Sequence, residues 1–265
     1  MVPRAIALIL VCYSLFAAAQ TKPRSPAAGA ASKTTQATAK QSPTAIIHTT
    51  AGDMKCTLFP DKDPKAVANF IGLAKGTKAW KDPKTGNMVH GKPLYDGVLF
   101  HRTIPDFMIQ AGDPTGTGSG DVGFEISDEL HPDLLFDQPG RMAMANRGGS
   151  PSTSASQFFI TEKAVPFLNP CLDEGGCPQV GRAKGTGYII FGQCDDSAVE
   201  LVKKIARMPC GSGSTCSGNN DRPQTPVKIQ HIEIQGAGAA GAAKSSGKKA
   251  ANTKSAAPSK SAPPK

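Results

Sequence analysis

The chain has 265 residues, and its 30 Lys and Arg against 21 Asp and Glu give a formal charge of +9. The excess lies at the two ends, because residues 1–44 and 236–265 hold eleven basic residues and no acidic one, whereas residues 45–235 hold 19 basic and 21 acidic residues. A basic nucleic-acid-binding domain is therefore excluded for the middle of the chain, and the lack of a G-X-Y period excludes a collagen-like chain.

Residues 1–19 have the pattern of a secretory signal peptide. Arg4 comes before an apolar run over residues 5–19, which ends in three alanines, the small residues that favour cleavage before Gln20. The run is shorter than the roughly 20 residues that a membrane-spanning helix needs, which argues against such a helix. An uncleaved membrane anchor is the alternative. We expect a cleaved signal peptide and therefore a periplasmic or secreted protein.

Residues 20–44 and 236–265 are rich in Ala, Ser, Pro, Gly and Lys. Such segments cannot bury enough apolar surface to offset the entropy cost of ordering the chain. We expect a disordered linker over residues 20–44, one folded domain over residues 45–235 and a disordered Lys/Ala-rich tail over residues 236–265. The basic tail is a candidate for contact with anionic components of the cell envelope.

The domain begins with a predicted hairpin and a helix. The apolar runs 45–50 and 54–59 are separated by Ala-Gly-Asp, a turn signal. Asp63 is the predicted N-cap of a helix with Pro64 at its first position, and Gly76 ends it after apolar residues at helical spacing. Residues 77–97 predict a long surface loop, in which Trp80 is a packing anchor.

The rest of the domain predicts short strands and one more helix. Apolar runs bounded by Gly, Pro and Asp predict strands over residues 98–102, 107–111, 141–145, 157–161, 188–192 and 226–234. A second helix begins at Asp195 or Asp196, with Val199, Val202 and Ile205 on one face. Many short strands with only two helices favour a closed or nearly closed antiparallel barrel, a mainly β fold.

The densest motif is FHRTIPDFMIQAGD over residues 100–113. Strand alternation places Met108 and Gln110 on one face and Phe107 and Ile109 on the other, unless a bulge intervenes. The Pro-containing bend after Arg102 lets that side chain fold back over the second strand. An arginine, a glutamine able to orient it and large apolar groups would then converge. Taken alone, the motif also fits a core strand pair with a surface arginine.

Three further motifs follow in order: MAMAN over residues 142–146, SQFFIT over 156–161 and IIFG over 189–192. Together the four motifs resemble the cyclophilin family of peptidyl-prolyl cis–trans isomerases, and in particular its bacterial members. The resemblance spans about residues 45–235. It implies an eight-stranded antiparallel β-barrel capped by two α-helices, no cofactor or metal, and proline-containing polypeptides as substrates. We expect a monomer.

The resemblance also implies site residues. Arg102 matches the family's catalytic arginine, and Gln110 matches the glutamine that positions it. Ten further positions match substrate-binding residues: His101, Phe107, Met108, Ala145, Asn146, Gln157, Phe159, Phe167, Leu168 and Tyr188. Phe167 stands where many eukaryotic members carry tryptophan, and Tyr188 where they carry histidine, so we expect weaker cyclosporin binding rather than lost catalysis. The loop between Asn146 and Gln157 is longer than the common form.

These residue types suit proline isomerisation. Partial double-bond character gives the X–Pro bond a rotation barrier of about 18–20 kcal/mol. At the twisted transition state the nitrogen lone pair is localised, so a guanidinium donor binds that state better than either planar isomer. The alternative is a binding module that uses the same surface with little turnover. The presence of both Arg102 and Gln110 favours the enzyme.

Two competing motifs are weaker. The serines of residues 150–156 could accompany His101 in a hydrolase, but they lack a G-x-S-x-G elbow. The glycines of residues 116–123 lack the lysine and the following helix of a phosphate loop, so we interpret them as turn residues.

Seven cysteines are present, and six lie outside the predicted signal peptide: Cys56, Cys171, Cys177, Cys194, Cys210 and Cys216. Export favours disulfides. The pairs Cys171–Cys177 and Cys210–Cys216 each enclose five residues and are the expected local links. Cys56 and Cys194 would then form the remaining pair or stay buried thiols. A zinc site is the alternative, although these gaps are wider than usual between zinc ligands.

Overall fold

The computed structural model describes residues 42–147, 155–178, 182–210 and 222–236, all within one unit, Lys40–Lys265. The predicted signal peptide, nearly all of the linker, and the Lys-rich tail from residue 237 onward lie outside the described residues. Within them, no helix is long and apolar enough to cross a membrane.

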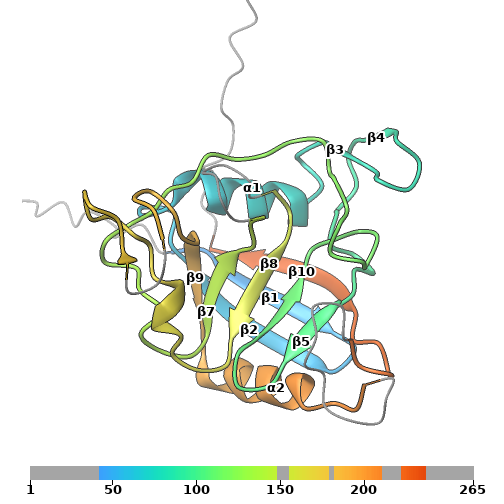
Figure 1. Ribbon diagram of the computed structural model, residues 1–265. Helices are drawn as coiled ribbons and strands as arrows, with labels where there is room; N and C mark the ends of the chain where they lie inside the picture. Colours follow the sequence, from blue (N-terminus) through green and yellow to red (C-terminus); the bar gives the residue numbers. More distant parts are fainter. Residues whose placement is uncertain (1–41, 148–154, 179–181, 211–221, 237–265) are drawn as a thin grey trace, which may run out of the picture. The chain divides into compact units, whose positions relative to one another are not determined.

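Eight strands form one antiparallel sheet in the order β10-β1-β2-β9-β7-β8-β6-β5 (Figure 1). The two edges meet, because Leu99 pairs with Lys228 and the N–H of Phe100 donates to the Val227 carbonyl at 3.0 Å. The sheet is therefore curled into a nearly closed barrel, as predicted. Its strands are β1 (Thr44–Thr49), β2 (Gly52–Leu58), β5 (Arg102–Ile104), β6 (Met108–Ala111), β7 (Arg141–Met144), β8 (Phe158–Thr161), β9 (Ile190–Cys194) and β10 (Ile229–Gln235).

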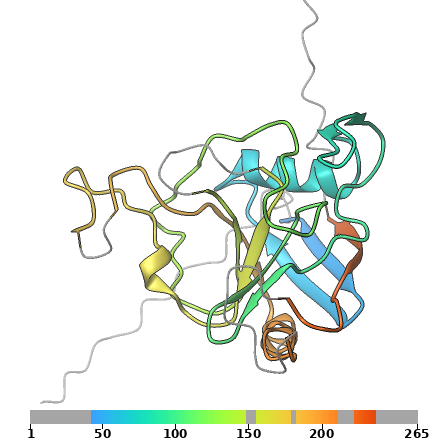
Figure 2. The ribbon, with the colours of Figure 1, turned by 45° about the vertical axis from the view of Figure 1, so that its right-hand side comes forward.

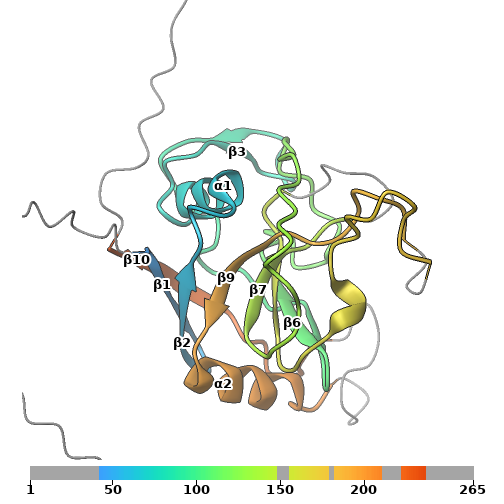
Figure 3. The same ribbon diagram turned by 90° about the vertical axis from the view of Figure 1, so that its left-hand side faces the viewer.

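Two α-helices, α1 (Pro64–Ala74) and α2 (Asp196–Ala206), lie on opposite sides of the strands, α1 at the top and α2 at the bottom of Figure 3. Figure 2 shows α2 almost end-on beneath the strands. Each helix buries one face against the sheet. Phe70 of α1 lies with its ring centroid 5.2 Å from Phe191 of β9 and 5.5 Å from Phe158 of β8, so it fills the centre of the main core.

The predicted cap of α2 is confirmed, whereas that of α1 is confirmed in position but not in its side-chain hydrogen bond. Asp195 Oδ1 accepts the N–H of Ala198 at 2.9 Å. Asp63 stands at the N-cap of α1, but its side chain accepts no cap hydrogen bond. Glu129 replaces it, since Oε2 accepts the N–H of Lys65 at 2.7 Å across 64 positions of sequence. Because Glu129 lies so far along the chain from α1, no local sequence pattern predicts that it caps this helix.

The segment over residues 77–97 is more than a surface loop. It contains a short hairpin of β3 (Trp80–Lys81) and β4 (Met88–Val89). Trp80 is a packing anchor, as predicted, because its indole donates to the Lys92 carbonyl at 3.2 Å. Leu94 and Tyr95 are buried, and the Tyr95 hydroxyl donates to the Ser156 carbonyl at 2.9 Å. The prediction failed because two core residues lie in a stretch dominated by Lys, Gly and Pro.

Two predicted disulfides are confirmed. Cys56 and Cys194 are opposite each other on β2 and β9 and are bonded, with an S–S distance of 2.03 Å. Cys171 and Cys177 form the expected local link. These four cysteines are therefore not zinc ligands. The predicted Cys210–Cys216 pair lies partly outside the described residues, which do not include residue 216.

Candidate active site

The β5–β6 hairpin brings the two predicted catalytic residues together. Arg102 and Gln110 are opposite each other in the register of the two strands, and Arg102 Nη1 donates to Gln110 Oε1 at 3.4 Å. Burial lowers the pKa of Arg102 below its usual value, but a guanidinium remains a cation at any physiological pH. The hairpin thus presents a half-buried, permanently charged donor.

A chain of side-chain amides fixes the orientation of Gln110. Its Nε2 donates to Gln157 Oε1 at 2.9 Å, and Gln157 Nε2 donates to the Gly118 carbonyl at 2.9 Å. Because each amide has its oxygen and nitrogen committed, the oxygen of Gln110 must face Arg102. Gln157, predicted only as a substrate-binding position, therefore also supports the Arg102–Gln110 pair.

Asp113 organises the loop in which this chain of amides ends. Its buried carboxylate accepts the backbone N–H groups of Thr115 at 2.7 Å, Gly118 at 2.6 Å and Gly120 at 3.1 Å. Burial opposes ionisation of Asp113, but the hydroxyl and N–H donors outweigh it and lower its pKa. Turn formation around one carboxylate therefore explains the glycine-rich stretch. The sequence analysis missed this role, although an Asp followed by alternating Gly and Thr was a possible signal.

A second apolar cluster, separate from the main core, lies beside the hairpin. We call it the site cluster; its buried members are Met108, Leu134, Phe136, Ala143, Phe159, Val165, Leu168 and Ile190. Three further predicted site residues, Phe107, Ala145 and Tyr188, are partly buried against it. Phe167 lies on a 3-10 turn (Pro166–Leu168), is 53% exposed, and has its ring 5.6 Å from that of Phe107. The predicted apolar residues therefore do gather beside the Phe107–Phe167 pair, in which Phe107 is partly buried and Phe167 is exposed.

The position of Phe107 differs from the one that strand alternation predicted. Alternation predicted that it would share a face with Ile109, but Ile109 is in the main core and Phe107 packs against the site cluster beside Met108. The reason is that β6 begins at Met108, so Phe107 belongs to the preceding turn. The guanidinium carbon of Arg102 is 6.0 Å from the centre of the Phe107 ring. The Arg102 guanidinium therefore lies next to the apolar side chains of the site.

Two predicted substrate-binding residues have other surroundings. His101 is only 3% exposed and lies against the loop of Asp113, where a Cβ on Gly118 would be 3.3 Å from Nε2. Burial lowers the pKa of His101, so its imidazole is neutral at physiological pH. Asn146 follows β7, and its Nδ2 donates to the Gly187 carbonyl at 2.6 Å. His101 is therefore packed against the Asp113 loop, and Asn146 is hydrogen-bonded to the segment before Tyr188; their roles in substrate binding stay predictions.

Phe136, which is not among the predicted site residues, lies at the centre of the aromatic packing. Its ring is stacked 5.8 Å from Phe159 and meets Tyr188 edge-on at 6.4 Å. Its N–H donates to Asn169 Oδ1 at 2.7 Å. The only available signal was the apolar group around residue 134 within a polar stretch that predicted no element.

Arg182 was also missed. Its Nη1 donates to the carbonyls of Leu168 at 3.1 Å and Asn169 at 3.3 Å, and its guanidinium carbon is 5.2 Å from the centre of the Tyr188 ring. The Cys171–Cys177 disulfide closes a short loop in the same segment, shortly before Arg182. Arg182 therefore links Leu168, a member of the site cluster, to Tyr188, which packs against that cluster. Among the described residues, no three His, Cys, Asp or Glu side chains are grouped as metal ligands would be.

The chain is similar in sequence to known proteins of one family. A family model described as cyclophilin type peptidyl-prolyl cis-trans isomerase/CLD matches residues 44–234. The chain is 43% identical over 192 residues to peptidyl-prolyl cis-trans isomerase A of Mycobacterium tuberculosis, which covers 72% of this chain and 91% of that protein. It is 38% identical over 192 residues to peptidyl-prolyl cis-trans isomerase B of Streptomyces anulatus, covering 72% and 95% of the two chains.

Two solved structures show that the similarity extends to the fold. The cyclophilin type isomerase of Cryptosporidium parvum matches with a TM-score of 0.52 and 30% identity over 73% of this chain and 96% of that one. A second crystal structure of that protein, determined in the presence of the dipeptide Ala-Pro, matches with a TM-score of 0.51, 31% identity, and coverage of 72% and 98%. The curled eight-stranded sheet, the two helices and the extent of these matches all point to one family. The chain belongs to the cyclophilin-type peptidyl-prolyl cis–trans isomerases and is an enzyme of that class.

Proposed function

We propose that Arg102 catalyses the isomerisation by donating a hydrogen bond to the nitrogen of the twisted X–Pro amide, in exported polypeptides that are folding. The observation that carries this proposal is the Arg102–Gln110 pair beside the site cluster. A charged donor and an apolar surface stand side by side, as the reaction requires.

The reaction needs a donor that distinguishes the transition state from the ground states. In a planar amide the nitrogen lone pair is delocalised and is a poor acceptor, whereas rotation localises it. A donor placed beside that nitrogen therefore stabilises the twisted state selectively, which is the condition for catalysis. Arg102 is suited because it is always charged and because its partial burial strengthens its electrostatic interactions.

The direction of the donor matters as much as its charge. The amides of Gln110 and Gln157 connect Arg102 to the Gly118 carbonyl, on the loop held by Asp113. The guanidinium is thus held before the substrate binds, so less reorganisation is needed at the transition state. We assign Gln110 to positioning Arg102 and Gln157 to positioning Gln110.

The site cluster would bind the proline ring. Its exposed side is formed by Phe107, Phe167 and Tyr188 over the buried Met108 and Phe159. Burial of apolar surface of the ring against these side chains favours binding by about 25 cal/mol per Å². The Ala-Pro dipeptide used with the Cryptosporidium parvum relative is consistent with proline-containing peptides as substrates.

Two features support a role outside the cytosol. Residues 1–19 have a signal-peptide pattern, and two disulfides lie within the described residues, a bond type that persists in oxidising compartments. We place the enzyme in the periplasm or among secreted proteins, where it would speed the folding of other exported chains. The lysines of residues 236–265 would favour retention near anionic envelope components.

Arg102→Ala in the full-length chain tests the mechanism. Removing one transition-state donor typically costs 10²–10³ in rate, so we expect kcat/KM for a proline tetrapeptide to fall about 100-fold in a protease-coupled assay. Arg102→Lys, which keeps the charge but not the planar fork, should be only partly active. Arg222→Ala, which removes an exposed arginine, is the matched control and should leave turnover unchanged.

Two results would contradict the proposal. Full turnover in R102A would remove Arg102 from the mechanism. A wild-type protein that binds proline peptides but does not accelerate their isomerisation would favour the binding module instead. Urea unfolding of each variant shows whether a loss of turnover reflects a loss of fold.

A further inference from the structure

The turn between β5 and β6 has an unfavourable backbone conformation beside the site. Asp106 has a φ of +58° and is the one non-glycine residue with positive φ in the described part of the chain. Residues with a Cβ disfavour this region because the Cβ approaches the carbonyl oxygen. Such a conformation persists only where its surroundings impose it. The next residue is Phe107, which packs against the site cluster.

Glu162, directly after β8, holds this turn on both sides. Its side chain is almost fully buried, and Oε1 accepts the N–H of Asp106 at 2.5 Å. Its own N–H donates to the Phe107 carbonyl at 3.0 Å. Hydrogen bonds to an ionised acceptor are among the strongest in proteins. Glu162 therefore fixes the peptide group before Asp106 and the peptide group after Phe107, so both ends of the turn are held.

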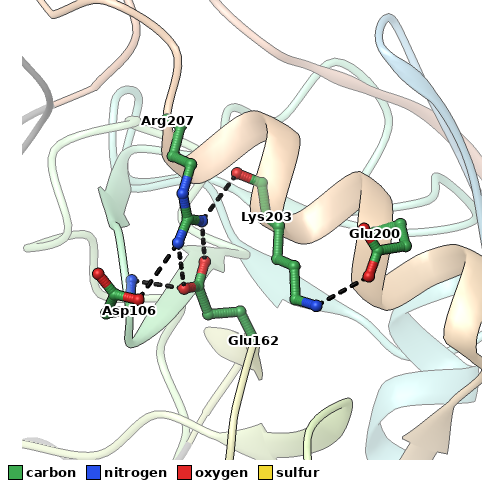
Figure 4. A network of polar contacts seen from close by, with 5 residues as sticks. All are labelled: Asp106, Glu162, Glu200, Lys203 and Arg207. Carbon is green, nitrogen blue, oxygen red and sulfur yellow. Dashed lines mark hydrogen bonds and ion pairs between the residues drawn. The ribbon is translucent and has the colours of Figure 1, made fainter.

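Arg207, at the end of α2, compensates the charge of Glu162 (Figure 4). Its Nη1 donates to Glu162 Oε2 at 2.8 Å and its Nη2 donates to Glu162 Oε1 at 3.1 Å, so the pairing is bidentate. Nη2 also donates to Asp106 Oδ1 at 3.2 Å. Glu162 raises the pKa of Arg207 in return. The pairing matters because an uncompensated buried carboxylate is strongly destabilising.

We infer that Glu162 and Arg207 are positioning residues of the isomerase, which hold Asp106 in its left-handed conformation and so direct Phe107 and Met108 into the site cluster. The inference rests on the proposed function, since it takes Phe107 and Met108 as residues that bind proline. It explains why Phe107 departs from strand alternation. Neither Glu162 nor Arg207 belongs to the site cluster, so they act on the substrate only through the turn.

Glu162→Gln in the full-length chain is the first test. The amide keeps the shape of the carboxylate, but it must point an N–H group at either Arg207 or the Asp106 N–H, so one contact is lost. We expect KM for a proline peptide to rise about three- to tenfold and kcat to change by less than about twofold, since Arg102 and Gln110 are not displaced. Two-dimensional NMR exchange at several peptide concentrations gives both constants.

Glu200→Gln is the matched control. Glu200 pairs with Lys203 at 2.8 Å on the exposed face of α2, in the same view of Figure 4. The substitution is the same and it also removes an ion pair of α2, but it does not touch the turn. KM and kcat should both equal those of the wild type.

Asp106→Gly separates positioning from stability. Glycine adopts a positive φ without support, so in the D106G background Glu162→Gln should no longer raise KM. It should still lower the midpoint of urea unfolding, because the link between β8 and α2 is weakened in either background. Arg207→Lys keeps the charge without the fork and should raise KM to a smaller extent than Glu162→Gln.

Three outcomes would overturn the inference: an unchanged KM in E162Q, an equal rise of KM in the Asp106 and D106G backgrounds, or an unchanged KM in R207K. R102A, measured in parallel, tells the two proposals apart. A large loss of kcat in R102A with an unchanged KM in E162Q refutes only the positioning role. An unchanged kcat in R102A refutes only the catalytic role of Arg102.

Discussion

Asp63 stands at the start of α1 with its carboxyl group fully buried, and within the described ranges neither oxygen has a hydrogen-bond partner. Burial and then the charge of Glu129 raise its pKa from 3.8 to about 7, while Lys62 partly opposes this rise. The folded protein therefore holds a proton between about pH 4 and pH 7 that the unfolded chain has already released. By linkage, the contribution of Asp63 to stability falls as the pH rises through this window, and the penalty is complete above pH 7.

Asp63→Asn removes the penalty. A rise from 3.8 to about 7 corresponds to roughly 4 kcal/mol at 1.36 kcal/mol per pKa unit. Partial screening beside Lys62 reduces this figure, so we expect the variant to be about 2–4 kcal/mol more stable than the wild type above pH 7. At pH 4 the folded wild type is protonated at Asp63 and the variant carries no charge there. The two proteins should therefore have nearly the same free energy of unfolding at this pH.

Urea unfolding of both proteins at one-unit steps from pH 4 to pH 8, with the disulfides intact, measures the difference. Asp133→Asn is the control with the opposite sign, because the hydrogen bond from Lys62 lowers the pKa of the exposed Asp133. Its contribution is present above pH 4 and is lost as the pH falls, so this variant should be less stable than the wild type at neutral pH. A stability difference for D63N that is the same at pH 4 and pH 8 would refute the reasoning.

Two further predictions concern packing and covalent links. Phe136→Ala should lower the free energy of unfolding by about 3–5 kcal/mol and raise KM, because Phe159 and Tyr188 lose the ring they pack on; an unchanged KM would show that the aromatic packing does not shape the site. Replacing Cys56 and Cys194 together by serine should cost about 3–5 kcal/mol, since their disulfide closes a loop with a sequence separation of 138; equal urea midpoints for variant and wild type would contradict this.

The parts of the site that lie on neighbouring strands could be predicted from the sequence. The bend between the two strands of FHRTIPDFMIQAGD places Arg102 opposite Gln110, and the structure confirms that pairing. The Asp195 cap and the buried face of α2 also follow from local spacing. In each of these cases, the residues that interact are close in sequence or occupy fixed positions of a repeating geometry.

The remaining parts depend on contacts between distant segments. Glu129 caps α1 from 64 positions away, and no pattern around Asp63 shows that its own carboxylate will be displaced. Phe107 departs from alternation because of a positive φ at Asp106, which is not a glycine and so gives no signal in the sequence. That conformation depends in turn on Glu162 and Arg207, which lie 56 and 101 positions away from Asp106.

The pairing of β1 with β10 places Thr44 opposite Gln235, so the chain enters and leaves the sheet at neighbouring points. Residues 20–43 and 236–265, with four and six basic residues and no acidic one, are therefore attached to the domain about one strand spacing apart. We propose that they act as two arms of one bivalent tether on an anionic surface, because binding by one arm would raise the effective concentration of the other. The ten basic residues of the two segments would then act from neighbouring points on the domain, and we expect truncation of either segment alone to weaken that attachment without abolishing it.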